Sequence, residues 1–332
     1  MHRRLHSFWP LSFFSLLLFN DVCWNTAQSN TRRCDMTVIA QKVQGAKKHK
    51  TQKSPGFYIS LVLRYLLLLL IGLISVAPFV LAALGTFKTN AEIIAYPPKL
   101  LPENWLFENW TKVWNTDIGS GGTFPRWMFN TAFLSVTVAS LQVIFCSMAA
   151  YAFARLNFPG KKAAFNFMLA TMMIPGAVTL IPAYVLMSKL HLINTYWALI
   201  IPGAVSAGGI FMLTQFFKSI PVDLEEAAVI DGASHVKIFS SVILPLARPA
   251  LLTVFILQFQ GMWNAFLQPL LYENSPDMYV LNVALSIFKQ QYKAQWNLTL
   301  VGAMFNAIPV LVLFFIFSRY YIEGISYTGV KG

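Results

Sequence analysis

The chain has 332 residues, of which 56% are hydrophobic and only 11% are charged. A soluble domain carries about 25% charged residues, so this composition excludes a disordered chain and argues strongly against a water-soluble globule. A lipid bilayer is the solvent that explains it. The formal net charge of +12 is then read by position, as a sign of membrane orientation rather than of nucleic-acid binding.

The first 57 residues are expected to form an N-terminal cytoplasmic segment that precedes the membrane domain. Arg3 and Arg4 come before an apolar run, 8–19, of signal-peptide length. Cleavage would leave the new N-terminus outside and carry the basic loops outside too, so cleavage is not expected. Two alternatives stay open: residues 1–35 form an interfacial or cytoplasmic extension, or translation starts at Met36, which directly precedes a basic stretch. The second is favoured.

Six stretches within residues 58–332 are apolar enough to cross a bilayer, which takes about 20 residues in a helix. Prolines inside several of them are tolerated where neighbouring helices satisfy the freed carbonyls. The sequence therefore predicts an all-α polytopic membrane protein with six transmembrane helices. The predicted spans are 65–84, 131–153, 165–187, 197–217, 250–271 and 298–320.

The distribution of basic residues predicts the orientation of these spans. With the N-terminus inside, 18 of the 25 Lys and Arg residues lie on the inner side and 7 on the outer side. The opposite orientation inverts this ratio, which the positive-inside rule disfavours. Both termini are therefore expected in the cytoplasm.

The inner loop 218–248 carries the most informative pattern in the chain. Pro221 and Asp223 predict a helix start, with Asp223 as N-cap and Glu226 three residues later in a capping-box arrangement. Gly232 interrupts the helical pattern and suits a left-handed turn. A second helical stretch is expected over 234–244. We therefore expect two short helices at an angle, protruding from the membrane.

The first of these helices offers a surface that suits a protein partner. Ala227 and Ala228 give a flat face that another chain can approach closely, and Glu225, Glu226 and Asp231 place charge around it. Taken alone, the same residues also fit an ordinary capped surface helix.

The spacing within the loop resembles a known signature. Glu226-Ala227-Ala228, then Gly232, then Val242-Ile243-Leu244-Pro245 is similar to the EAA motif of membrane subunits of bacterial ABC importers, with Val242 where isoleucine is usual. Further stretches resemble the carbohydrate branch of that family, and in particular the smaller permease of maltose-type sugar importers. They are Asn130-Thr131, 149–155 with 158–161, 192–197 and 324–332.

The resemblance implies a type I ABC importer permease fold in the bacterial inner membrane. It implies that the helix around Glu225, Glu226, Ala227 and Ala228 is a coupling helix that docks on an ATPase, with Asp231 beside it and Gly232 allowing its bend. The implied partners are a second, larger permease, two ATP-binding subunits and an extracytoplasmic solute-binding protein, with a sugar as substrate. The chain has no phosphate-binding loop of the form G-x-x-x-x-G-K-[ST]. It is thus expected to be a transport subunit rather than an enzyme, to bind no cofactor or metal, and to rely on ATP used by its partners.

The expected span cores contain no Asp, Glu or His, which argues against an ion-coupled carrier. In the fifth span, Gln260, Asn264 and Gln268 lie four residues apart on one expected helix face, beside Trp263. Amides bind hydroxyls and aromatic faces stack on sugar rings, so these residues are candidates for the substrate path. They also suit hydrogen bonds between helices, and this second interpretation is favoured.

Two functional alternatives and one further expectation complete the analysis. The same architecture would serve another solute, such as a glycerol phosphate, although no basic residue lies in the span cores. A channel or ion-coupled secondary transporter is the alternative from another class; it would depend on an ion gradient instead of ATP. By position, the outer hairpin 272–297 resembles a family loop that reaches into the binding protein, which implies that it helps to unload sugar; an ordinary solvent-exposed loop is the alternative.

Overall fold

The computed structural model describes residues 55–117, 122–291 and 295–329. The expectations about residues 1–54, including a start at Met36, lie outside the described residues. The chain divides into two units, residues 1–71 and 72–332. Within the described part of the first unit lies only the beginning of helix α3 (Pro55–Gly85).

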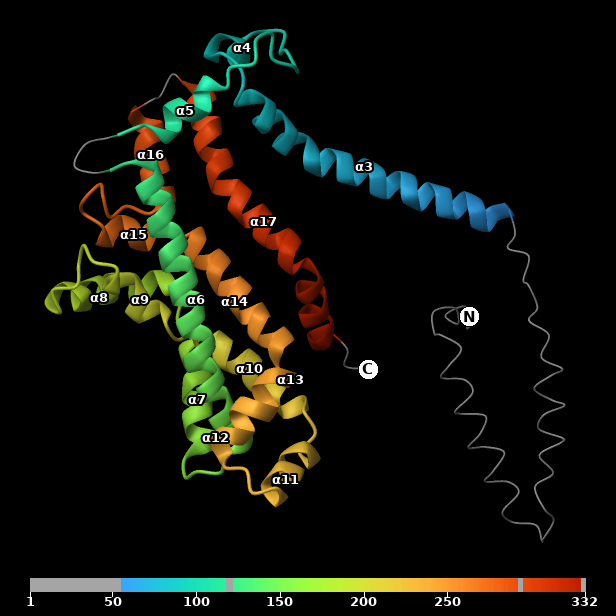
Figure 1. Cartoon of the computed structure of the whole chain (residues 1–332), viewed down its shortest axis with the longest axis vertical. Helices are drawn as coiled ribbons and strands as arrows, with labels where there is room; N and C mark the ends of the chain where they lie inside the picture. Colours follow the sequence, from blue (N-terminus) through green and yellow to red (C-terminus); the bar gives the residue numbers. More distant parts are fainter. Residues whose placement is uncertain (1–54, 118–121, 292–294, 330–332) are drawn as a thin grey trace. The chain divides into compact units, whose positions relative to one another are not determined.

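The described part of the second unit is built of helices, as the sequence predicts (Figure 1). Its longest helices are α6 (Phe124–Arg155) and α17 (Trp296–Gly329), together with the second part of α3. The other elements are α4 (Asn90–Ile94), α5 (Glu108–Trp114), α7 (Lys161–Thr171), α8 (Gly176–Lys189), α9 (Trp197–Gly203), α10 (Ala207–Ser219), α11 (Asp223–Ile230), α12 (His235–Ile238), the π-helical turn η1 (Phe239–Ile243), α13 (Leu244–Leu246), α14 (Arg248–Trp263), α15 (Leu267–Tyr272) and α16 (Leu281–Gln291).

Four helical stretches among the described residues are long and apolar enough to span a membrane: Ser60–Gly85, Phe124–Arg155, Trp197–Ser219 and Trp296–Phe317. Each corresponds to a predicted span. Two further pairs of helices pass the same criterion only when each bent pair is taken as one span, which gives up to six. An all-helical membrane protein is confirmed, while the number of spans lies between four and six.

The third predicted span, 165–187, is wrong as a single straight helix. α7 ends at Thr171 and α8 begins at Gly176, and the two helices meet at 99°. Pro175 precedes α8 as its N-cap residue with an extended backbone (ψ 133°). Proline lacks the N–H of a helical residue and disfavours helix in the residue before it, which explains a break here.

The fifth predicted span, 250–271, is also corrected. α14 ends at Trp263, and the separate short helix α15 begins at Leu267. On the other side, His235–Leu246 joins α14 through a 77° bend, with Pro249 in the first turn of α14. Apolar composition alone does not reveal such breaks, because the residues on both sides of each break are largely apolar.

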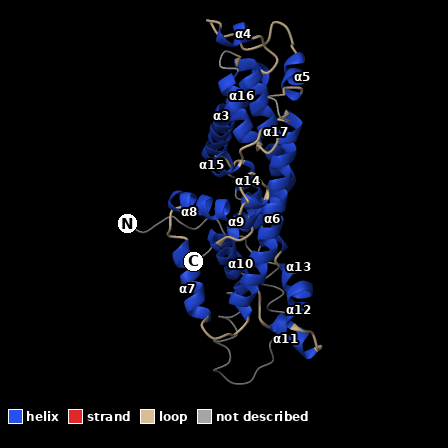
Figure 2. Cartoon of the chain, turned by 90° about the vertical axis from the view of Figure 1, so that its left-hand side faces the viewer, coloured by secondary structure: helices blue, strands red, loops and turns tan. Residues whose placement is uncertain are grey.

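α6 is the central helix of the second unit. It packs along α10 and α14, and α14 packs in turn on α17 (Figure 1). Figure 2 shows α4, α5 and α16 near one end of α6 and α11 and α12 near its other end. The helices α4, α5 and α16 therefore lie at one end of α6, and the helices α11 and α12 lie at its other end.

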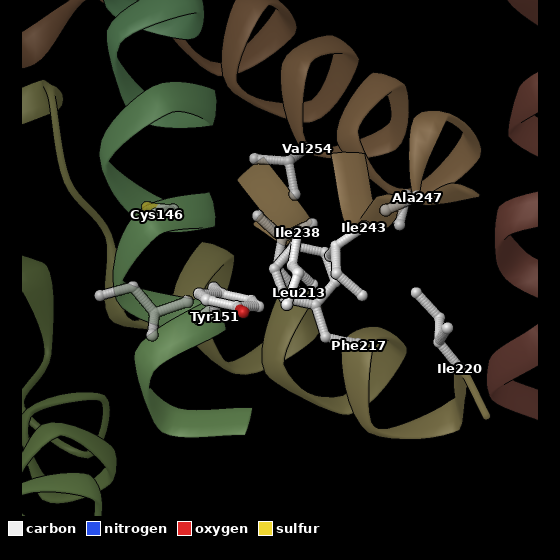
Figure 3. Close-up of a cluster of buried hydrophobic side chains, with 12 residues drawn as sticks. Cys146, Tyr151, Leu213, Phe217, Ile220, Ile238, Ile243, Ala247 and Val254 are labelled. Atoms are coloured by element: carbon white, nitrogen blue, oxygen red, sulfur yellow. The ribbon is translucent and has the colours of Figure 1, made fainter. Parts of the chain in front are cut away.

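Separate apolar clusters hold this arrangement together along α6. Near Arg155, Cys146 and Tyr151 pack with Leu213 and Phe217 of α10 and Ile243 of η1 (Figure 3). Near Phe124, a second cluster joins Trp127 to buried residues of α5, α16 and α17. Inside a bilayer such clusters hold helices together by van der Waals packing, because lipid is as apolar as the side chains that leave it.

Large apolar side chains also cover much of the outer surface. The large apolar side chains of α3 are exposed from Val62 to Leu81; Leu68, for example, is 62% exposed. Such continuous apolar surface is far larger than a soluble monomer presents, and it fits contact with lipid or with another membrane chain.

Candidate functional site

The candidate site is the bent segment 219–247, which contains α11, α12, η1 and α13 and lies at the Arg155 end of α6 (Figure 2). We call it the coupling segment. It follows α10 and leads into α14, two helices that both pack on α6. The expected pair of short helices with a turn between them is confirmed.

The start of α11 differs from the prediction by one residue. Asp223 is the first helical residue and Val222 stands at the N-cap without a side-chain cap. The Val222 carbonyl already accepts hydrogen bonds from the N–H groups of Glu225 (2.8 Å) and Glu226 (3.0 Å), so the first turn begins before Asp223. The three acidic side chains of this turn instead suit the positive end of the helix dipole.

The turn between the two helices is built as expected. Gly232 has φ +79°, a left-handed conformation that side chains other than glycine rarely adopt. Its N–H donates to Val229 and the next N–H donates to Ala228, which closes the end of α11. Ser234 caps the second helix, because its Oγ accepts from the Lys237 N–H at 3.4 Å. A π-helical turn then interrupts the second helix at Phe239–Ile243.

The two glutamates of α11 point to different surroundings. Glu225 is largely buried and forms an ion pair with Arg155, with 2.5 Å between Oε1 and Nε; the two side chains are 12% and 10% exposed. Glu226 is exposed and has no ion-pair partner among the described residues. Ala228 packs against the apolar cluster beneath, whereas Ala227 is exposed. The predicted set of docking residues thus divides into an inner and an outer face.

The outer face remains available to another chain. Glu226, Ala227, Asp231 and Gly232 are all exposed, and so is Ile230, which is 86% exposed. This face therefore carries one large aliphatic side chain and two acids that no described residue covers.

The candidate substrate-path residues do not share one helix face in the structure. Gln260 lies in α14, Asn264 follows its last residue, and Gln268 belongs to α15. Asn264 donates from Nδ2 to the Gln260 carbonyl at 2.9 Å, so its amide closes the helix end. Gln260 is exposed and lines a small cavity of about 130 Å³ with apolar side chains of α14 and α17.

Trp263 lies in the interior rather than on an open surface. It is 3% exposed, and its indole N–H donates to Asn306 of α17 at the carbonyl (3.1 Å) and at Oδ1 (2.9 Å). Asn282 of α16 joins this network by donating to the Trp263 carbonyl (3.2 Å) and accepting from Asn306 (3.1 Å). Three helices are thus tied by polar groups, as is common in membrane proteins.

A second candidate region lies at the Phe124 end of α6, in the loop 273–281. We call it the outer loop, because it belongs to the hairpin that the sequence predicts to lie on the outer side. Side chains of α6 hold its backbone. The Trp127 indole donates to the Pro276 carbonyl (2.8 Å), and Asn130 donates to the carbonyls of Asp277 (2.8 Å) and Tyr279 (3.0 Å). Thr131 Oγ1 accepts from the Leu281 N–H at 2.7 Å.

Asn194, in the loop between α8 and α9, clamps the same loop from another side. Its Oδ1 accepts from the N–H groups of Asn274 (2.9 Å) and Ser275 (3.0 Å), and its own N–H donates to the Tyr272 carbonyl (2.8 Å). It adopts φ +63°, which asparagine tolerates better than most residues. Tyr196 then donates to Asn130 Oδ1 at 2.7 Å, linking the two clamps.

Glu273 is a buried carboxyl at the start of the outer loop. It is 4% exposed; Oε2 accepts from the Val280 N–H at 2.8 Å, while Oε1 has no hydrogen-bond partner. Burial raises the pKa of Glu273 from 4.5 to about 8, although the Val280 N–H works in the opposite direction. The carboxyl is therefore protonated at neutral pH.

Sequence reasoning missed the roles of Arg155, Asn194 and Glu273. Asn130 and the stretch 192–197 were noted for their resemblance to sugar importer permeases. Their positions in the sequence, however, give no indication that both bind the outer loop. Only the positive φ of Asn194 could have been expected from the sequence, because asparagine in a turn tolerates the left-handed conformation.

The chain belongs to the family of binding-protein-dependent transport system inner membrane components, which matches residues 142–323. It is 33% identical over 264 residues to the arabinooligosaccharides transport system permease protein AraQ of Halalkalibacterium halodurans, covering 79% of this chain and 93% of AraQ. It is 32% identical to the diacetylchitobiose uptake system permease protein NgcG of Streptomyces coelicolor, covering 76% and 83%.

A solved structure shares the fold. A bacterial ABC transporter that imports the acidic polysaccharide alginate has a chain that superposes with a TM-score of 0.69 at 24% identity, covering 81% of this chain and 98% of that one. The family match includes the whole coupling segment and the outer loop.

Proposed function

We propose that this chain is a permease subunit of an ATP-driven ABC importer for sugars, with di- or oligosaccharides as the substrate class. The observation that carries the proposal is the coupling segment: two short helices about a left-handed Gly232, with Glu226, Ala227 and Asp231 exposed. Family membership supports a binding-protein-dependent system. The substrates named for AraQ and NgcG support a sugar rather than a glycerol phosphate.

In this proposal the coupling segment is cytoplasmic and docks on an ATP-binding subunit through its outer face. Glu226, Ala227 and Asp231 meet the partner, while Glu225 and Ala228 fasten α11 to the rest of the permease. Two such ATPases would move two permeases, this chain and a larger one, between inward-facing and outward-facing states. ATP is used by the partner subunits, and this chain binds no cofactor.

The outer loop lies on the opposite side of the membrane and meets an extracytoplasmic solute-binding protein. Its backbone is held at many points, so it presents a defined surface rather than a mobile tether. Both chain termini are then cytoplasmic, in agreement with the excess of basic residues on the inner side. An ion-coupled carrier, the alternative class, fits neither the family nor the span cores without acids.

Replacement of Glu226 by Lys tests the docking surface. The variant should enter the membrane but fail to co-purify with the ATP-binding subunit, because an exposed carboxylate becomes a cation at the proposed contact. Glu108→Lys is the matched control: it makes the same charge change at an exposed site in α5, and should leave co-purification unchanged. Normal assembly of the Glu226 variant would contradict the docking proposal.

Replacement of Gly232 by Val tests whether the turn between α11 and α12 transmits the movement of the ATPase to the permease. Nothing lies within 4 Å of the position that a Cβ would take, so the change acts first through the backbone conformation. A left-handed residue other than glycine costs roughly 1–2 kcal/mol, which should tilt α11 against α12. We expect uptake per ATP hydrolysed to fall while membrane insertion stays normal. Full uptake in this variant would exclude a lever that depends on this turn.

A further inference from the structure

The stretch between α3 and α6 exposes large apolar side chains although it lies outside the candidate spans. We call residues 86–117, which contain α4 and α5, the outer cap. Within it, residues 94–107 carry a set of large apolar side chains that are each more than half exposed, and we call this set the apolar rim. Its members are Ile94, Tyr96, Leu100, Leu101, Trp105 and Phe107. The proposed function uses none of these side chains.

Hydrogen bonds fix the outer cap to the places where two candidate spans end. The Leu106 N–H donates to the Phe87 carbonyl (2.9 Å), two residues after α3 ends at Gly85. Asn90 Oδ1 accepts from the N–H of Trp296, the first residue of α17, at 2.8 Å. Figure 1 shows α4 and α5 in this region. A segment that is held at the ends of two spans lies close to the level at which the chain leaves the hydrocarbon core.

Aromatic side chains gather at this level. The ring centroids of Trp105 and Phe107 lie 5.4 Å and 5.1 Å from that of Phe87. Trp296, at the start of α17, is 47% exposed, and Tyr96 in the apolar rim is 96% exposed. Tryptophan and tyrosine are enriched where a membrane meets water, because each joins an apolar ring to a polar group. The outer cap therefore has the composition of an interfacial belt.

The charges within the apolar rim cancel each other. Lys99 and Glu103 are the only charged residues in the stretch 94–107, and they form an ion pair with each other. An unpaired charge that approaches hydrocarbon is costly. The stretch carries no net charge, so this cost does not oppose contact between the rim and an apolar phase.

A lipid surface explains the rim better than a soluble partner does. The outer loop, which is the surface proposed to meet the solute-binding protein, exposes no large apolar side chain among its residues 273–281. A binding protein that docks and leaves would expose the rim to water between encounters, whereas the membrane is always present. The exposed apolar surface of α3 also reaches Leu81, near the end of the helix that leads into the cap.

We propose that the apolar rim inserts into the outer leaflet, at the boundary between headgroups and acyl chains, and so anchors the outer cap to the lipid surface. Leu100 and Leu101 supply aliphatic surface to the acyl chains, while Tyr96 and Trp105 keep their polar groups at the level of the headgroups. Because the rim is neutral, the anchor requires no particular headgroup charge. It acts whatever solute is transported, so it goes beyond the proposed function and does not depend on it.

Depth measurement with spin labels tests the anchor on the full chain in vesicles of phosphatidylethanolamine and phosphatidylglycerol. Single labels are placed at Leu101→Cys and Tyr96→Cys, with the native cysteines replaced by serine. Collisions with oxygen, which concentrates in hydrocarbon, and with a neutral nickel chelate, which stays in water, report the depth of each label. We expect both labels to lie about 5–10 Å into the boundary of headgroups and acyl chains, as interfacial segments do.

Two further labels provide the matched controls. Asn274→Cys is exposed on the outer loop and should lie in water. Leu68→Cys lies in the candidate span Ser60–Gly85 and should lie deeper than the rim. Rim labels that meet the nickel chelate as often as the Asn274 label would overturn the proposal.

Replacement of Leu100 by Glu tests whether the apolar character of the rim holds the cap in the membrane. A carboxylate is costly in an apolar phase, so the Tyr96 label should shift toward water. Leu224→Glu makes the same change at an exposed position of α11, far along the chain from the cap, and should leave the depth of the Tyr96 label unchanged. An unchanged depth in the Leu100 variant would contradict the anchor.

Addition of protein partners decides between lipid and the other occupants. The depth of both rim labels should be the same before and after the solute-binding protein or the second permease is added. Labels that lie in water in the vesicles and become protected only with one of these partners would identify the rim as a protein interface, which refutes the lipid anchor. Failure of the chain to support sugar uptake would count against the proposed function alone, because the label depths are measured without transport.

Discussion

Glu273→Gln should remove a pH dependence that is built into the outer loop. The pKa of Glu273 lies at about 8 in the folded loop because the carboxyl is buried, against an ordinary value of 4.5. Between these two pH values the closed loop binds a proton that the opened loop releases. The stabilisation is thus fully present below pH 4.5 and is lost as the pH rises toward 8.

The size of the effect follows from the same two values. One pKa unit corresponds to 1.36 kcal/mol, so the free energy of opening should fall by about 4–5 kcal/mol between pH 4.5 and 8. Glutamine is neutral at every pH and keeps an oxygen that can accept from the Val280 N–H. The variant should therefore show an opening free energy that does not change across this range.

Hydrogen exchange of the amides in residues 273–281 measures this opening. Protection in the variant and in the unmutated protein is compared at equal pH, so that the intrinsic pH dependence of exchange cancels. Asp277→Asn is the matched control, since it neutralises another acid of the same loop that is only half-buried. In this control, the protection of the loop amides should still fall as the pH rises, as in the unmutated protein. Equal pH profiles for Glu273→Gln and the unmutated protein would refute the assignment of a buried, protonated carboxyl.

Thr131→Val keeps the side-chain shape but leaves the buried Leu281 N–H without its acceptor, so the outer loop should lose about 1–3 kcal/mol of protection, whereas Thr131→Ser should not. Gly203→Ala should lower the melting temperature, because the new Cβ would lie 2.6 Å from Cγ1 of the fully buried Val138; Val138→Ala in the same chain should restore it, and a failure to do so would locate the strain elsewhere. Asn264→Ala should change sugar uptake if its amide lines the path, and should leave uptake intact if the amide only closes α14 through the Gln260 carbonyl.

Much of the architecture was predictable because it depends on local composition. Apolar stretches long enough to cross a bilayer lie where the sequence predicts them, and Gly232 takes the left-handed conformation that its position between two helical patterns indicates. The breaks at Pro175 and after Trp263 were not predicted, since both sides of each break are apolar and hydropathy does not distinguish a straight helix from a bent pair.

The candidate site was predictable in position but not in the roles of its residues. Glu225 and Glu226 are chemically identical neighbours in the sequence, and both are predicted to meet a partner. One residue of helix rotates a side chain by about 100°, so one carboxylate turns toward Arg155 and the other toward solvent.

The sequence by itself determined that this is a helical membrane protein, where its apolar stretches lie and which loop carries the signature of its family, because each of these depends on residues close together in the chain. Only the tertiary structure decided that Arg155 holds Glu225, that Asn130 and Asn194 hold one outer loop, and that α6 carries both surfaces. Such pairings join residues as far apart in the chain as Thr131 and Leu281, which are separated by 150 positions, and only the packing of helices brings them within hydrogen-bond distance.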